Sequence, residues 1–188
     1  MGWLAIIDRC PRCGAPRTGS GSPFRCVACG LTLFGNPAVG VGCFVRDAAG
    51  RHLFTVRGKD PGKGLLGLPG GFVDAGESAE DALHREVREE IGGAISGIRY
   101  LCSSPNRYLF GGVEYDVLDI FYTAELVAGE LRLDPDEIGA LRWIPTADVR
   151  IEDIAFPSMR VAWRLLERGA PAPTGPRGSS PAPSAGQH

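Results

Sequence analysis

The sequence lacks the features by which membrane and exported proteins are recognised. Its apolar runs are far shorter than the ~18 residues that a membrane-spanning helix requires. The first ten residues, MGWLAIIDRC, have neither the basic start nor the long apolar stretch of a signal peptide. We therefore expect a cytoplasmic protein that does not enter a membrane.

The chain also has little net charge, since 20 Lys and Arg residues oppose 22 Asp and Glu residues and leave a formal charge of −2 at pH 7. This balance provides no overall basic field, so nucleic acid is an allowed partner but not a favoured one. Hydrophobic residues make up 44% and charged residues 22% of the 188 residues, as in an ordinary globular protein. These values exclude a chain that is disordered throughout, and they predict one domain with a small appendage.

Four of the six cysteines form two Cys-x-x-Cys pairs, Cys10 with Cys13 and Cys26 with Cys29, separated by twelve residues. Disulfides are rare in a reducing cytosol, and two such pairs at this separation are typical of a four-thiolate zinc site. A redox dithiol and a pair of disulfides are the alternatives. Because the segment has few other apolar residues, we expect residues 1–35 to be a zinc ribbon that depends on its metal to fold.

Residues 36–168 alternate strand-like and helix-like segments, which predicts an α/β domain. Strands are predicted over 38–46, 51–57, 95–103, 107–110, 114–126 and 141–144, and helices over 78–91 and 155–168. The segment 58–71 is rich in glycine and proline and predicts a loop. The last residues, 169–188, are of low complexity, and we expect a disordered tail there.

Three carboxylates on the helix over 78–91 form a candidate metal site. Glu86 precedes Glu89 by three residues and Glu90 by four, so the three lie along one side of a helix. At about 100° per residue, Glu86 and Glu90 share the apolar side of the helix, Glu89 lies at its edge, and Arg85 takes the opposite side. A solvated charged face is the alternative, but carboxylates that face the protein repel one another unless a cation compensates them.

Oxygen ligands favour Mg²⁺ or Mn²⁺, and Mg²⁺ commonly binds substrate phosphate oxygens as well, which indicates a phosphate-containing substrate. The apolar segment before the helix contains Gly70 and Gly71. Glycines allow a backbone carbonyl to approach a ligand or a metal closely, although a plain turn is the alternative.

Taken together, Gly71, Glu77 and residues 85–92, Arg-Glu-Val-Arg-Glu-Glu-Ile-Gly, resemble the Nudix box, GX5EX7REUXEEXGU, in which U is aliphatic. All seven fixed letters are present, and only the last aliphatic position departs, since Gly93 occupies it. The resemblance implies an α/β/α sandwich with a mixed sheet over 36–168. It also implies hydrolysis of a nucleoside diphosphate linked to another group, with divalent ions neutralising the developing charge.

The resemblance assigns roles to residues by their position in the box. The expected Mg²⁺ ligands are the helix carboxylates and one backbone carbonyl: Glu86, Glu89, Glu90 and Gly71. Glu77 is an accessory ligand or a stabiliser of the helix start, and Arg85 orients the glutamates through ion pairs. Glu137, in the acidic segment 134–137, is the candidate general base or further metal ligand, with an acidic turn as its alternative.

A zinc ribbon directly before a Nudix domain resembles the NADH pyrophosphatase group. The SQPWPFPxS signature of that group is missing from Ser103–Tyr108, and Ala155–Ser158 matches it only in part. The chain is more similar to zinc-ribbon Nudix proteins that act as ADP-ribose pyrophosphatases. The expected reaction is therefore Mg²⁺-dependent hydrolysis of ADP-ribose or of a dinucleotide such as NADH, with release of a nucleoside monophosphate.

Two other functions stay open at this point. The first is a ligand-sensing or nucleic-acid-binding Nudix module without strong catalysis, which the arginines of the ribbon favour. The second is an RNA-end pyrophosphohydrolase, which performs the same chemistry on a larger substrate. The resemblance also allows a homodimer, although no sequence feature requires one. Tyr108, Phe110 or Tyr115 are candidates for stacking on a base.

Overall fold

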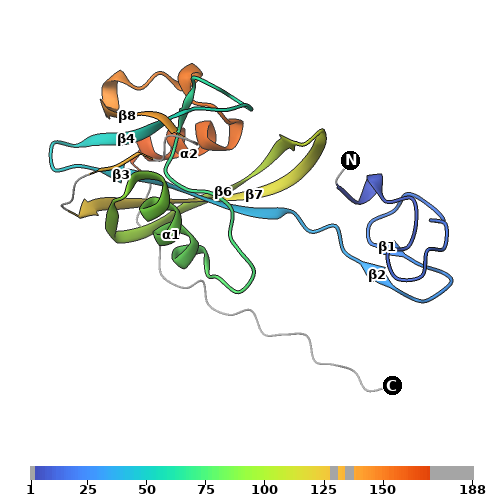
Figure 1. Ribbon diagram of the computed structural model, residues 1–188. Helices are drawn as coiled ribbons and strands as arrows, with labels where there is room; N and C mark the ends of the chain where they lie inside the picture. The colour runs from blue at the N-terminus through green and yellow to red at the C-terminus, as the bar shows by residue number, and fades with distance from the viewer. Residues whose placement is uncertain (1–2, 128–130, 134–137, 170–188) are drawn as a thin grey trace.

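The computed structural model describes residues 3–127, 131–133 and 138–169. Figure 1 shows a small N-terminal module joined by one segment of chain to a larger body built on a sheet. The module contains η1 (Trp3–Ile6), β1 (Phe24–Arg25) and β2 (Thr32–Leu33). The larger body contains β3 (Ala38–Arg46), β4 (Arg51–Arg57), β5 (Leu66–Gly67), α1 (Ala79–Ile91), β6 (Ala94–Phe110), β7 (Val113–Val127), β8 (Ile138–Pro145), η2 (Thr146–Asp148), η3 (Ile151–Asp153) and α2 (Pro157–Glu167).

The larger sheet has six strands and mixed directions. Its order is β5-β4-β3-β7-β6, and β8 pairs with β4 beside this path. Strands β3 and β7 run parallel, whereas the other pairs are antiparallel. The sheet is therefore mixed, as expected from the sequence.

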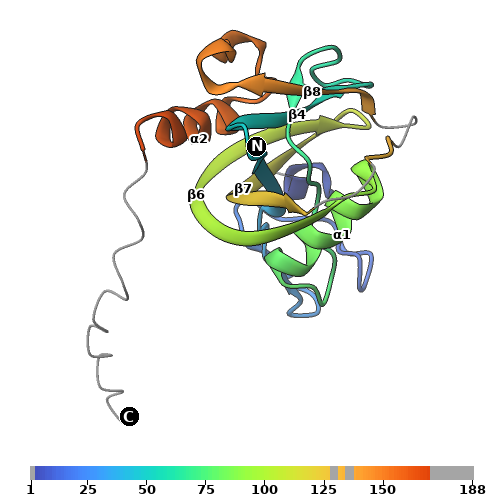
Figure 2. The same cartoon turned by 90° about the vertical axis from the view of Figure 1, so that its left-hand side faces the viewer.

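The two helices cover opposite faces of this sheet (Figure 2). Successive side chains of a strand point to opposite faces, so Val41, Cys43 and Val45 of β3 pack in one apolar cluster with Leu83 of α1. Phe44, which lies between two of them, packs in the other cluster with Trp163 of α2. Both clusters contain fully buried side chains, and the expected α/β/α sandwich is confirmed.

Several element boundaries differ from the prediction. The two strands predicted over 95–103 and 107–110 are one strand, β6, in which Pro105 pairs with Leu118. Proline is tolerated there because β6 is an edge strand with one side free of sheet hydrogen bonds. The predicted loop over 58–71 contains β5, and β8 begins three residues earlier than predicted, at Ile138. The C-terminal helix spans 157–167 rather than 155–168, and most of the predicted tail lies outside the described residues.

Candidate functional site: a carboxylate cavity and a cysteine cluster

Helix α1 carries the carboxylates, and its two ends are fixed by local hydrogen bonds. Ser78 caps the start, because its hydroxyl accepts a hydrogen bond from the Asp81 N–H at 3.1 Å. Gly92 ends the helix in the left-handed conformation at φ 63°, and its N–H donates to the Arg88 carbonyl. Because the buried side of α1 fixes how the helix is rotated, its glutamates point toward the segment that precedes the helix.

That segment approaches α1 closely at two glycines. Gly70 has φ 142°, and a Cβ on it would meet the Val41 carbonyl oxygen of β3. A Cβ on Gly71 would collide with the carboxylate of Glu86. The Gly70 N–H donates to Oε2 of Glu90 at 2.9 Å. The missing side chain of Gly71 therefore leaves room for the Glu86 carboxylate, whereas that of Gly70 lets the backbone pack against β3 while its N–H binds Glu90.

Arg85 binds several of these groups and lies within the site rather than away from it. Its guanidinium donates to Glu86 Oε1 at 2.8 Å, to Glu89 Oε2 at 3.1 Å and to the Phe72 carbonyl at 3.0 Å. The helical-wheel prediction that Arg85 faces the opposite side is wrong for the charged group, because the long side chain reaches back past its own Cα position. Hydrogen bonds to Glu77, and after it to Glu86 and Glu89, raise the pKa of Arg85 and keep it charged.

Glu77 is a third acid that Arg85 binds. Its two oxygens accept bonds from Arg85 Nε at 2.8 Å and Nη2 at 3.0 Å, and Oε2 also accepts from the Asp74 N–H. These bonds lower the pKa of Glu77 to about 2. Both oxygens are thus engaged in fixing Arg85 and the start of α1.

A cavity of about 710 Å³ opens over these groups. Glu86, Glu89 and Glu90 line it together with Gly71 and Arg85. The side chain of Glu86 is 15% exposed, whereas that of Glu89 is 59% exposed. These three carboxylates therefore lie at different depths of the cavity, where a bound ligand could contact them.

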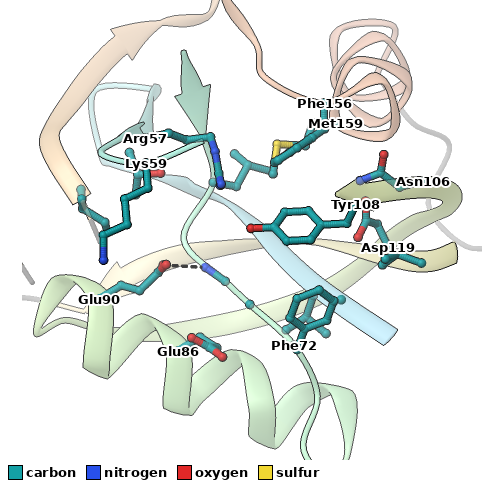
Figure 3. A pocket seen from close by; sticks show the side chains of 18 of the residues that line it. Arg57, Lys59, Phe72, Glu86, Glu90, Asn106, Tyr108, Asp119, Phe156 and Met159 are labelled. Carbon is teal, nitrogen blue, oxygen red and sulfur yellow. Dashed lines mark hydrogen bonds between the residues drawn. The ribbon is translucent and has the colours of Figure 1, made fainter. Parts of the chain in front are cut away.

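The other walls of the cavity come from elements for which the sequence predicted no role in the site. Figure 3 shows Lys59 extending toward Glu90 and Arg57 lying above the cavity. Arg57 stacks on the ring of Phe156 with 4.8 Å between the guanidinium carbon and the ring centroid. No local motif marks these residues, because they come from the end of β4, the following loop and the start of α2.

Aromatic rings form one side of the cavity. The Tyr108 ring lies 5.7 Å from that of Phe72 and 6.0 Å from that of Phe156, measured between centroids. Tyr108 and Phe110 line the cavity, as their alternation along β6 allows. Tyr115, the third stacking candidate, is not among the described residues that line it.

The cysteine cluster lies in the N-terminal module. The sulfur atoms of Cys10, Cys13, Cys26 and Cys29 all lie within 4.8 Å of one another. The Cys10–Cys29 and Cys13–Cys26 sulfurs are 3.7 and 3.6 Å apart. Four sulfurs at about 2.3 Å from a tetrahedral Zn²⁺ are about 3.8 Å apart, so these spacings fit zinc and not disulfides.

The two cysteine pairs also share one backbone arrangement. Gly14 and Gly30 follow the pairs with φ of 73° and 75°. Each donates its N–H to the carbonyl of the first cysteine of its pair, Cys10 and Cys26 respectively, at 2.9 Å. This repeat turns both sulfurs of a pair to one side, which is the arrangement that a single metal ion requires.

One predicted site residue, Glu137, lies outside the described residues. Cys43, a cysteine outside the cluster, is fully buried, and burial raises the pKa of its thiol to about 12, as for an unreactive core residue. Of the helices that the structure describes, none has the length and apolar character needed to cross a membrane.

Comparison with known proteins assigns the larger body to a family. The Nudix domain family matches residues 36–163, which is more than half of the chain. The chain belongs to the Nudix hydrolase family. The residues of the box and the carboxylates that line the cavity lie within the matched residues.

Curated Nudix relatives include two kinds of hydrolase. The chain is 28% identical over 162 residues to the NAD-capped RNA hydrolase NudC of Deinococcus radiodurans, covering 84% of this chain and 55% of that protein. It is 36% identical over 107 residues to the ADP-ribose pyrophosphatase of Methanocaldococcus jannaschii, covering 55% of this chain and 60% of that protein. The chain thus spans about half the length of the curated relatives it matches.

Solved Nudix structures share the same fold. The MutT Nudix hydrolase of Burkholderia pseudomallei is 32% identical with a TM-score of 0.60, over 69% of this chain and 97% of that one. The Nudix domain of Shewanella oneidensis NrtR, solved in complex with ADP-ribose, is 25% identical with a TM-score of 0.58, over 72% and 90% of the chains.

Proposed function

We propose that the chain is a divalent-cation-dependent pyrophosphohydrolase that cleaves the diphosphate of a nucleoside diphosphate derivative and releases a nucleoside monophosphate. ADP-ribose, or a dinucleotide such as NADH, is the preferred substrate. One observation carries the proposal: three glutamates of α1 line the same cavity as three cationic side chains and a wall of aromatic rings. Such a cavity suits a ligand with a charged centre and a planar end.

The carboxylates provide a donor set suited to Mg²⁺ or Mn²⁺. Glu86, Glu89 and Glu90 would hold the ion with oxygen atoms, and the missing side chain of Gly71 leaves its backbone open toward Glu86. The Gly71 carbonyl accepts one hydrogen bond from the Val41 N–H at 2.8 Å, so a second lone pair remains for a metal. When bound, the ion polarises the diphosphate and neutralises charge that develops as water attacks phosphorus.

The remaining roles follow from position around this donor set. Arg85 keeps Glu86 and Glu89 in place through its ion pairs, and Glu77 in turn fixes Arg85. Arg57 and Lys59 are placed to bind phosphate oxygens at the cavity wall. Glu137 remains our proposed general base or further metal ligand, and Ile138, the next residue in the sequence, lines the cavity.

The test is a hydrolysis screen with Mg²⁺ or Mn²⁺ on NADH, ADP-ribose, nucleotide sugars, dinucleoside polyphosphates and NAD-capped RNA. We expect one substrate class to release AMP, and Glu90→Gln to lower kcat by about 100-fold or more, because it removes a charge aimed at the ion. Glu167→Gln, an exposed acid of α2 outside the cavity lining, is the matched control. Turnover that is equal in the wild type and Glu90→Gln would contradict the proposal.

The general base is tested separately. Glu137→Gln should lower kcat with little change in KM. The kcat of the variant should also no longer decline as the pH is lowered, because the base whose protonation causes that decline is gone. If the profile keeps its acid limb and kcat is unchanged, the base is another residue.

Ligand sensing is the second candidate function, and the ADP-ribose complex of the Shewanella oneidensis Nudix domain is the observation that favours it. Tight ADP-ribose binding without turnover, in wild type and Glu90→Gln alike, would support sensing. The ribbon arginines give less support to nucleic-acid binding. The Arg17 guanidinium donates to the carbonyls of Leu4, Ile7, Gly19 and Gly21 inside its own module.

The cysteine cluster has a structural part in this proposal. Four thiolates fill a tetrahedral zinc site and leave no position for substrate or water. The zinc would therefore hold β1 and β2 together and would take no part in hydrolysis.

A further inference from the structure

A polar cluster at one end of the cavity has no part in the metal site. It consists of Asn106 on β6, Asp119 on β7 and Ser158 at the start of α2. In Figure 3, Asn106 and Asp119 lie on the opposite side of the cavity from Glu90. They are therefore placed to contact a part of the ligand other than its diphosphate.

The Asp119 carboxylate is held in position from two sides. The Ser158 hydroxyl donates to Asp119 Oδ2 at 2.5 Å, and the Asn106 side chain donates to the same carboxylate. The other oxygen, Oδ1, lies over Gly40, which pairs with Asp119 across the parallel strands β3 and β7. A Cβ on Gly40 would lie 2.6 Å from that oxygen, so the space that Oδ1 occupies depends on the glycine.

Burial of the Asp119 carboxylate carries a desolvation cost, and a contact that only joins β7 to α2 does not require an acid. Burial raises the pKa of Asp119, although the bonds from Ser158 and Asn106 oppose this effect. A neutral side chain would tie the strand to the helix with a smaller desolvation cost. A carboxylate has about four acceptor positions, and two bonds leave room for donors on a ligand.

The neighbouring wall suits a planar ligand. The Tyr108 ring, between those of Phe72 and Phe156, lines the cavity near this cluster. A base packed against these rings would present its edge to Asp119 and Asn106. A carboxylate accepts from amino groups, and an asparagine amide can donate to one ring nitrogen of adenine while accepting from its amino group.

We propose that Asp119, positioned by Ser158 and assisted by Asn106, binds the exocyclic amino group of the substrate's adenine and so selects the base. This inference rests on the proposed function, since it places the nucleoside at the aromatic end and the diphosphate at the glutamates. The assignment makes Asp119 a specificity-determining residue and gives it no part in the metal site.

The test compares binding of AMP with binding of purine riboside 5′-monophosphate, which is AMP without the amino group. Calorimetry on the full chain would measure both ligands on the wild type, Asp119→Asn and Asn106→Ala. We expect the wild type to prefer AMP by about 10-fold, as for one hydrogen bond to a charged group. In Asp119→Asn the preference for AMP should fall to about 2-fold or less. The variant should weaken binding of AMP, which has the amino group, and leave the affinity for purine riboside 5′-monophosphate nearly unchanged.

Glu167→Gln, which removes an exposed acid of α2 outside the cavity lining, is the control and should keep the full preference for AMP. Thermal melting of each variant checks that it folds. Asn106→Ala, on the edge strand β6, should also lower the preference for AMP, and it supplies a second readout if Asp119→Asn melts early. Equal affinity of the wild type for the two ligands, no binding of either, or an equal loss of both in Asp119→Asn would overturn the inference.

The two proposals fail in different ways. Binding of these monophosphates requires no catalysis, so a preserved preference for AMP without any hydrolysis would contradict the proposed function and support the base site. Hydrolysis of ADP-ribose without that preference would contradict the base site alone.

Discussion

The cysteine module and the carboxylate cavity hold their candidate metal ligands in different ways. In the module, the four ligands come from two tight turns and lie within 4.8 Å of one another, around a small apolar cluster. In the cavity, the glutamates project from one helix that is anchored by a large core, and Arg85 lies among them. The first arrangement would enclose an ion completely, whereas the second would leave one side of an ion open to substrate.

The difference predicts what each region would need from a metal. The module buries few apolar side chains, so we expect its folding to depend on metal binding. The Nudix domain has two apolar clusters, and Arg85 forms ion pairs with Glu86 and Glu89. We therefore expect this domain to need its metal for chemistry and not for folding.

Removal of zinc should have the largest effect, and it should affect the cysteine module alone. A zinc-selective chelator with excess Mg²⁺ should unfold residues 3–33, because structural zinc contributes on the order of 10 kcal/mol in small domains. Hydrolysis should persist, since the cavity residues belong to the other part of the chain. Backbone NMR signals and kcat, measured together, check this expectation.

Cys13→Ser should reproduce the effect of the chelator, and Cys102→Ser, which changes a thiol outside the cluster, should not. A loss of kcat in proportion to zinc lost would show that the two regions are coupled.

The two glycines of the cavity should separate folding from activity. Gly70→Ala should destabilise the domain by about 3 kcal/mol, because the new Cβ meets the Val41 backbone and φ is 142°. Gly71→Ala should cost much less stability, since its Cβ meets the end of the flexible Glu86 side chain. It should instead lower kcat/KM by about 100-fold through displacement of that carboxylate.

Denaturant unfolding and steady-state kinetics on both variants supply the measurements. A Gly71→Ala variant with normal activity would show that the Glu86 position is unimportant for catalysis.

Arg85→Lys tests whether the ion pairs organise the glutamates or only neutralise them. Lysine keeps the charge but cannot make several bonds in a fixed plane, so kcat should fall by between about 10-fold and 100-fold. Arg88→Lys, on the exposed side of α1, is the matched control. A variant with wild-type kcat would mean that the charge alone suffices.

The sequence predicted the parts of this molecule that depend on local pattern. The helix over 78–91 and the inward direction of Glu86 and Glu90 follow from local sequence and helix geometry, and the structure contains both: α1 spans Ala79–Ile91, and the two carboxylates line the cavity. The spacing of the two cysteine pairs likewise predicted the cluster, because each pair is one local turn.

The parts that the sequence did not predict depend on long-range packing. Asp119 reaches the cavity through the parallel pairing of β3 with β7, and Phe156 reaches it through the docking of α2. The position of the Arg85 guanidinium was mispredicted, because a wheel places the Cα atom and not the end of a long side chain. Nothing in the neighbouring residues marks these three contacts.

Glu77 gives the smallest expected effect and tests the Nudix domain without any metal. Its pKa is about 2 in the folded chain, against an ordinary value of 4.5, because Arg85 and the Asp74 N–H bind the ionised form. A lowered pKa means that the contribution to stability is present above pH 4.5 and is lost as the pH falls toward 2. The melting temperature of the wild type should therefore exceed that of Glu77→Gln at pH 6 to 7 by about 2 to 4 °C, and the difference should shrink across this acid window. Glu167→Gln controls for the loss of one charge, and a difference that stays constant from pH 7 to pH 2 would show that Glu77 acts through packing and not through its bond to Arg85.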